Sequence, residues 1–327
     1  MNETLDFSYI PDLLKESSVV AIQIFFFISY LTLPFYIYVH NLNRSKEKDL
    51  PFVQLFYKIV KWSYWFCSTA VLMITLMMLL YASLSDNYIL VKKIGILIMF
   101  IFFMTSIFIF HILQQTIHLL LFLLAIINSL KYHLPIHFAF KSQDFIRKYI
   151  TPLNVFFISL DAAAFMLHFL RQYCLLSTEK VQIFIACNEV LYMFLNVVIS
   201  FLTPFIYIPI MIDIRKNRHL HSPQHMFLHN YIFFQSFLVV LFKLIILPFC
   251  FETGNSSIEF FIMMLKVAIG DVLTAPLIIQ LSYLKCNIHE LIVLNKTFDL
   301  YKFVKVILGK TENSVHPSEA PVVFSIT

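Results

Sequence analysis

The chain has 327 residues, of which 60% are hydrophobic and 13% are charged, and its mean hydropathy is +0.81. These values exclude an ordinary soluble domain, in which about half of the residues are apolar and about a quarter are charged. The chain has four glycines, and no two of them lie closer than 16 residues. This spacing excludes the glycine-rich loops that bind nucleotide phosphates.

Seven apolar stretches are long enough to cross about 30 Å of hydrocarbon as helices. They cover residues 19–39, 62–82, 94–127, 152–170, 182–212, 231–251 and 258–284. Their apolar character does not alternate and lasts far beyond the length of a strand, which favours helices. The sequence therefore predicts an all-α membrane protein with a bundle of seven transmembrane helices.

Lysine and arginine are distributed unevenly between the connections. One set of alternate connections, which includes the C-terminal segment, carries 17 of them, and the opposite set carries 5. By the positive-inside rule, the N-terminus is predicted to be extracellular and the C-terminus cytoplasmic. This excess of basic residues on the side that faces anionic lipid also accounts for the net charge of +5. The net charge therefore does not indicate a nucleic-acid partner.

Four regions follow from this topology. We expect a short extracellular N-terminus at 1–18, the seven-helix domain at 19–284, an amphipathic helix at 285–310 and a disordered tail at 311–327. The amphipathic segment has an apolar stripe typical of a helix that lies on membrane lipids at the inner leaflet. The stripe comprises Ile288, Leu291, Ile292, Phe298, Val304 and Leu308.

A charged side chain at the centre of a transmembrane helix costs about 2.5–3.5 kcal/mol on insertion scales, so each one is expected to be paired or functional. The spans contain Asp161, Glu189, Lys243, Lys266 and Asp271. We expect Lys243 to pair with Asp271 across the sixth and seventh spans. Two interpretations remain open: a clamp between helices, or a site in which Lys243 or Lys266 is the counter-charge of an acidic small molecule.

The third span carries a polar stripe, formed by His111, Gln114, Gln115, Thr116 and His118. Its helical spacing predicts that the stripe faces the inside of the bundle. His111 and Gln115 are the members expected to reach a ligand pocket, whereas His118 lies deeper. The candidate ligand-binding residues are therefore His111, Gln115, Glu189, Lys243, Lys266 and Asp271.

Motifs for catalysis and metal binding are missing from the sequence. There is no H-E-x-x-H or G-x-S-x-G motif, and Ala268 stands where a membrane aspartyl protease needs glycine. Four histidines between 219 and 229 lack a cysteine or acid to complete a zinc site. We therefore predict neither catalytic residues nor a metal or cofactor.

Several motifs resemble the nematode serpentine chemoreceptors, most closely class Z. They are Leu33-Pro34-Phe35-Tyr36-Ile37-Tyr38-Val39, Leu121-Phe122-Leu123-Leu124-Ala125-Ile126, Ile206-Tyr207-Ile208-Pro209-Ile210, and the stretch from Pro276 to Leu284. The resemblance implies a chemosensory receptor of the plasma membrane, in the cilium of a sensory neuron, that binds a small molecule and signals through a heterotrimeric G protein.

Four residues are candidates for the G-protein face by position: Asn128, Arg147, Arg215 and Lys216. Asn128 stands where the family has a polar pair that includes arginine. The alternative function is a transporter or channel subunit that uses Asp161, Lys243 and Asp271 as a charge path.

Overall fold

The computed structural model describes residues 10–309 except for 49, 84–88, 134–141, 174–182, 185, 186, 188, 189, 192, 193, 218–221 and 251–256. Within these residues the chain is almost entirely helical. The helices are α1 (Ile10–Asn43), α2 (Pro51–Ser83), α3 (Ile89–His133), α4 (Ser142–Tyr173), the π-helical turn η3 (Phe194–Val198), α6 (Ile199–Lys216), α7 (Pro223–Cys250), α8 (Ser257–Cys286), α9 (Ile288–Lys296) and α10 (Leu300–Ile307).

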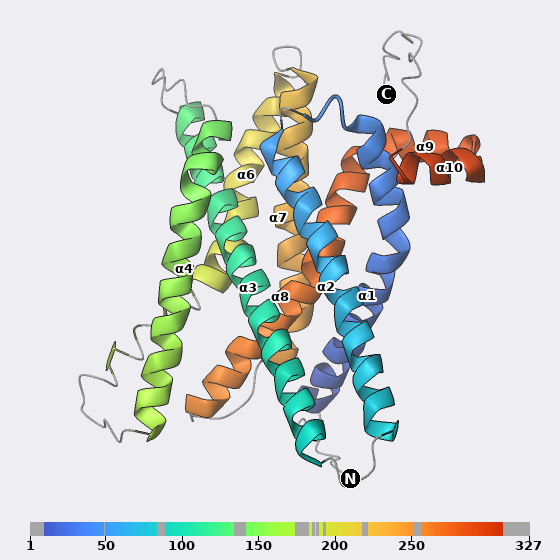
Figure 1. Cartoon of the computed structure of the whole chain (residues 1–327). Helices are drawn as coiled ribbons and strands as arrows, with labels where there is room; N and C mark the ends of the chain where they lie inside the picture. The colour runs from blue at the N-terminus through green and yellow to red at the C-terminus, as the bar shows by residue number, and fades with distance from the viewer. Residues whose placement is uncertain are drawn as a thin grey trace, which may run out of the picture.

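The long helices form one bundle, and α9 and α10 lie across one end of it (Figure 1). Among the described residues, four stretches are by themselves long and apolar enough to cross a membrane: Val20–Asn43, Phe52–Leu76, Lys93–Leu130 and Met226–Ile246. A fifth stretch joins Ile269–Cys286 to α9 through a bend of 77°. With α4 and the η3–α6 segment beside them, these helices confirm the predicted all-α, seven-transmembrane class.

Several helices extend beyond the predicted spans. The second begins at Pro51 instead of residue 62, the fourth begins at Ser142 instead of residue 152, and α3 has 45 residues, about 68 Å of helix. Charged side chains such as those of Lys58 and Lys61 end an apolar stretch but not a helix. Both are exposed on α2, where a long side chain can reach the polar surface while the helix continues.

The segment that the sequence predicts as one amphipathic helix forms the two helices α9 and α10. The break follows from Asp299, whose carboxylate accepts hydrogen bonds from the backbone N–H groups of Tyr301, at 2.9 Å, and Lys302. An aspartate that caps a new helix in this way ends the continuity with the preceding one. Leu294, Phe303 and Val306 are buried, whereas most of the predicted stripe is exposed.

The largest cluster of buried apolar side chains among the described residues lies in the half of the bundle next to α9 and α10. Its centre holds four tyrosines from four helices, namely Tyr36, Tyr207, Tyr231 and Tyr283, each with no exposed surface. The ring of Tyr283 lies 5.2 Å from that of Tyr36 and 6.0 Å from that of Tyr231. This aromatic core joins α1, α6, α7 and α8.

Helix α8 is central to the bundle, since it contacts α1, α2, α3 and α7. Its approach to α7 is close at Gly270, where an added Cβ would lie 2.9 Å from Cγ2 of Ile246. A small residue at this point permits the two backbones to approach each other. The next residue along α8 is Asp271, so the close contact also positions a buried carboxylate.

Candidate functional site

Lys243 of α7 and Asp271 of α8 form a buried ion pair in the interior of the bundle. The Nζ of Lys243 lies 3.6 Å from Oδ2 of Asp271, and both side chains are about nine-tenths buried. The structure thus brings together the two charges that the sequence predicts as partners. Pairing reduces the cost of holding both charges away from water.

The polar stripe of α3 faces the interior, as the sequence predicts. All five of its side chains are buried, and their contacts are partly internal to the helix: Gln115 Nε2 lies 2.7 Å from His111 Nε2, and Gln114 Nε2 lies 2.9 Å from His118 Nε2. Other contacts of the stripe cross to neighbouring helices. Thr116 donates to Asn154 Oδ1 of α4 at 2.7 Å, and His118 Nδ1 lies 3.2 Å from the hydroxyl of Ser200 in α6.

Two small cavities border this polar region. One is lined by residues that include His118, Ser200 and Ser236, and the other by residues that include Ser63 and Gln114. Each has a volume of about 10 Å³, which is close to the space that one water molecule needs. These cavities can hold a solvent molecule but not an organic ligand without movement of the helices.

Of the other three charged residues in the predicted spans, the structure describes the side chain of Lys266 alone. Lys266 is half-buried on α8, more than one helical turn before Asp271. Glu189 lies outside the described residues. Asp161 belongs to α4, but its side chain is not described. The structure therefore brings His111, Gln115, Lys243 and Asp271 into the buried interior and leaves the position of Glu189 untested.

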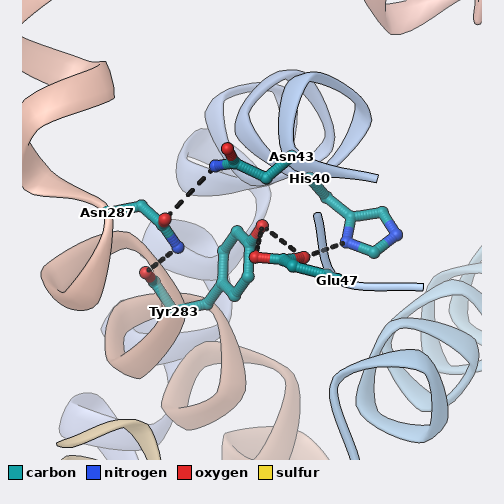
Figure 2. Close-up of polar contacts among 5 residues, drawn as sticks. All are labelled: His40, Asn43, Glu47, Tyr283 and Asn287. Carbon is teal, nitrogen blue, oxygen red and sulfur yellow. Dashed lines mark hydrogen bonds and ion pairs between the residues drawn. The ribbon is translucent and has the colours of Figure 1, made fainter. Parts of the chain in front are cut away.

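A second polar centre lies at the end of the bundle that carries α9 and α10, and it is built around Glu47 (Figure 2). Glu47 follows α1 and is 4% exposed. The hydroxyl of Tyr283 in α8 lies 2.8 Å and 2.9 Å from its two carboxylate oxygens, and donates its hydrogen to them. Nδ1 of His40 lies 3.5 Å from Oε2 of Glu47. The carboxylate thus joins the end of α1 to α8.

Two asparagines extend this centre toward α9. Asn43 donates through Nδ2 to Oδ1 of Asn287 at 3.2 Å, and Asn287 donates to the backbone carbonyl of Tyr283 at 3.1 Å (Figure 2). Asn287 is the residue at which the chain bends between α8 and α9. The ring of His40 stacks on Tyr57 of α2 at 4.0 Å. Residues from α1, α2, α8 and the bend are therefore tied together.

A third group of polar contacts lies on α8 between Asp271 and Tyr283. Gln280 is fully buried and donates to the hydroxyl of Tyr64 in α2 at 2.7 Å, and it also contacts the hydroxyl of Thr32 in α1. The Tyr64 hydroxyl in turn donates to the carbonyl of Ser29 at 2.6 Å. Polar side chains thus link α8 to neighbouring helices at three positions along its length, which are Asp271, Gln280 and Tyr283.

Glu47 is not predicted from the sequence, because it lies in a connection with Arg44, Lys46 and Lys48, where an acid is normally solvated. Glu47 lies seven residues after His40, in a basic connection that also contains Asp49, so the sequence gives only a weak signal for it. The hydroxyl that satisfies its carboxylate belongs to Tyr283, 236 residues further along the chain, so the burial of Glu47 follows only from the tertiary structure.

The residues predicted for the G-protein face lie near the same end of the bundle. Asn128 is in the last part of α3 and contacts the hydroxyl of Tyr207 at 3.5 Å. Arg215 and Lys216 are exposed in the last turn of α6. Arg147 is in the first part of α4, although its side chain is not described. Asn128 is therefore partly engaged inside the bundle, whereas Arg215 and Lys216 are on its surface.

A cavity of about 630 Å³ opens between the adjacent ends of α6, α7 and α8. It combines apolar side chains with two exposed cations, and it is lined by Ile214, Arg215, Pro223, Met226, Phe227, Asn230, Phe234, Lys285 and Cys286. This cavity is at the end of the bundle that carries α9 and α10. Arg215, which the sequence predicts for the G-protein face, lines this cavity.

Residues 19–288 match the family model described as serpentine type 7TM GPCR chemoreceptor Srz. The chain belongs to this family. The match begins within α1, covers the other long helices and ends at the first residue of α9, and it confirms the resemblance that the motifs indicate. No match was found among the curated proteins or among the solved structures.

Membership in the Srz family makes the chain a multi-pass membrane protein of a chemoreceptor class, a class of receptors and not of enzymes. Within the part of the chain that the structure describes, no three histidine, cysteine, aspartate or glutamate side chains are grouped as metal ligands. The polar centres around Asp271 and Glu47 are thus the features of this receptor fold whose chemistry can be tested directly.

The ion pair between Lys243 and Asp271 leads to a stability prediction. We expect Lys243→Met or Asp271→Asn alone to lower the amount of folded protein, because each leaves one buried charge unpaired, at a cost of about 3–5 kcal/mol. The double variant should recover most of the loss. Thermal unfolding of the detergent-purified protein and the surface level in cells measure the effect. A double variant that is less stable than either single variant would contradict the pairing.

The hydrogen bond between Tyr283 and Glu47 leads to a second stability prediction. Tyr283→Phe removes one oxygen and leaves the buried carboxylate without its hydroxyl donor, so we expect a loss of about 1.5–3 kcal/mol. Adding Glu47→Gln should cost less than it does in the wild-type background, because the partners act together. Thermal unfolding measures both variants. Tyr301→Phe, at an exposed tyrosine, is the control, and an equal effect of the two tyrosine changes would refute the role of the contact.

Proposed function

We propose that this chain is a G-protein-coupled chemosensory receptor of the plasma membrane, in the cilium of a sensory neuron. It binds a small molecule in the half of the bundle remote from α9 and α10, and signals through a heterotrimeric G protein at the opposite end. The observation that carries the proposal is the match of residues 19–288 to a chemoreceptor family. The positive-inside rule supports the proposed orientation, in which the connections that carry 17 lysines and arginines are cytoplasmic.

The proposed ligand site uses the polar residues that the bundle holds away from water. His111 and Gln115 of α3 are buried, as are Lys243 of α7 and Asp271 of α8. Lys266 is half-buried on the part of α8 that is more remote from α9. A cation at this position favours an acidic small molecule, because an anion that leaves water needs a counter-charge. Glu189 is retained as a candidate on sequence grounds.

The proposed G-protein face is the cavity between the ends of α6, α7 and α8, together with the surface around it. The lining of apolar side chains beside Arg215 and Lys285 suits a partner segment that presents both apolar and acidic groups. Lys216 and Arg147 extend the basic character of this end. Asn128 lies inside the bundle beside Tyr207, where it could respond to a movement of α3 against α6.

The first experiment expresses the receptor in cells with and without a heterotrimeric G protein and applies a panel of small carboxylic acids. We expect a calcium signal that requires both Lys266 and the G protein. Lys266→Met should abolish most of the response without a change in surface level, whereas Lys266→Arg, which keeps the charge, should retain it. An unchanged response of Lys266→Met would rule out Lys266 as a ligand residue. A current that persists without the G protein would instead favour a channel.

The second experiment tests the G-protein face. The Arg215→Ala/Lys216→Ala double variant should reduce ligand-stimulated nucleotide exchange on the G protein severalfold, because both cations lie on the proposed docking surface. The surface level should be unchanged. Arg44→Ala removes an exposed cation from the same end of the bundle but outside the cavity, and should have little effect. Equal losses for the two variants would show that only the overall charge of this end matters.

A further inference from the structure

A groove of about 320 Å³ runs between the end of α1, the end of α8 and α9. It is distinct from the cavity between α6, α7 and α8, since the two share no residue. Five of the lining side chains are apolar and one is polar: Phe35, Leu284, Leu291, Leu294, Phe298 and Asn295. The polar residue lies near the end of α9. The walls of the groove are therefore apolar except at one edge.

The walls of the groove are held in place by α10. The ring of Phe303 lies 5.8 Å from Phe35 and 5.6 Å from Phe298, and it stacks on Tyr38 at 5.1 Å. Asn41 of α1 donates through Nδ2 to the backbone carbonyl of Val306 at 2.9 Å. These contacts attach α10 to α1 on one side of the groove. The groove therefore exists before any ligand is bound.

The groove continues an apolar surface of α1 that faces away from the bundle. Val20, Ile24, Phe27, Leu31 and Phe35 are all exposed, with fractions from 41% to 64%, and follow one another at intervals of three or four residues. Side chains at this spacing form one stripe along a helix. In a membrane protein such a stripe contacts acyl chains. Since Phe35 also lines the groove, an acyl chain that lies along the stripe would lead directly into the groove.

The polar edge of the groove is basic. Lys296 directly follows Asn295, and Lys302 lies in the first turn of α10; both side chains are exposed. The nearest acid in the sequence is Asp299, and its carboxylate accepts hydrogen bonds from the first amides of α10. The two helices lie across the end of the bundle, where lipid headgroups would be found (Figure 1). Lys296 is next in sequence to a residue that lines the groove, and Lys302 is next to Phe303, which packs on Phe35 and Phe298. These two lysines are therefore the cations available to an anion at this edge.

We propose that this groove binds one acyl chain of an anionic phospholipid, with the headgroup at Lys296 and Lys302. The inference rests on the membrane location of the fold and not on coupling to a G protein. The apolar lining accounts for the acyl chain, and the lysines account for a preference for a negatively charged headgroup. The lipid would join α9 and α10 to the outer surface of α1.

The test counts lipids that remain bound to the full-length protein. The protein is purified in a mild detergent with equal amounts of phosphatidylserine and phosphatidylcholine, and bound lipids are counted by native mass spectrometry. We expect one retained phosphatidylserine, preferred over phosphatidylcholine by at least about fivefold, the factor that corresponds to about 1 kcal/mol for one lysine near a headgroup. Equal retention of the two lipids would overturn the proposal.

Matched variants separate the groove from general lipid contact. Asn295→Trp places a bulky side chain in the groove and should abolish the retained lipid, whereas Val293→Trp, on the exposed side of the same helix, should not. The Lys296→Glu/Lys302→Glu variant should remove the preference, while Lys48→Glu, at another exposed lysine of this end, should keep it. Retention that is unaffected by Asn295→Trp, or displacement of the lipid by a sterol, would refute the assignment. None of these readouts depends on signalling, so failure here is distinguishable from failure of the proposed receptor function.

Discussion

The buried carboxylate of Glu47 is the constraint on which the α9 and α10 end of the bundle depends. A carboxylate that is almost without exposure needs donors, and the Tyr283 hydroxyl reaches both of its oxygens. Because Tyr283 belongs to α8, this contact holds α8 against the end of α1. Asn287 then fixes the bend, through Asn43 on one side and the carbonyl of Tyr283 on the other. The direction of α9 is thereby set by a small polar cluster inside an aromatic core.

Helix α8 connects this cluster with the ion pair in the interior. Asp271 and Tyr283 are twelve residues apart on one helix, about 18 Å along its axis, with the buried Gln280 contacts between them. A ligand that changed the position of Asp271 would act on an element that also carries Tyr283. Such a ligand shifts the equilibrium only by its difference in affinity for the two arrangements. The polar centres around Asp271 and Glu47 are therefore the places where two arrangements of α8 can differ in free energy.

The sequence predicts those features that follow from the cost of polar groups in hydrocarbon. Lys243 and Asp271 were predicted to pair because neither charge is tolerated alone, and the stripe of α3 was predicted to face inward for the same reason. Helix ends were predicted less well, since Lys58 and Lys61 interrupt an apolar stretch but not α2. Glu47 was missed entirely, because its burial arises from tyrosines on α1, α7 and α8. The break before α10 depends on Asp299, which caps α10, and the amphipathic pattern of the sequence continues through this point without showing the break.

The end of α8 also separates two openings with different surroundings. Leu284 lines the groove beside α1 and α9, whereas Lys285 and Cys286 line the larger cavity beside α6 and α7. The exposed apolar side chains of α9 and α10, such as Ile288, Ile292 and Leu300, would be unfavourable in water but not in contact with lipid. If these helices lie in the membrane interface, the groove that continues the α1 stripe faces lipid. The larger cavity combines polar and apolar lining. Consecutive residues of one helix thus divide the proposed lipid groove from the proposed G-protein cavity, and a change in the bend at Asn287 would alter both.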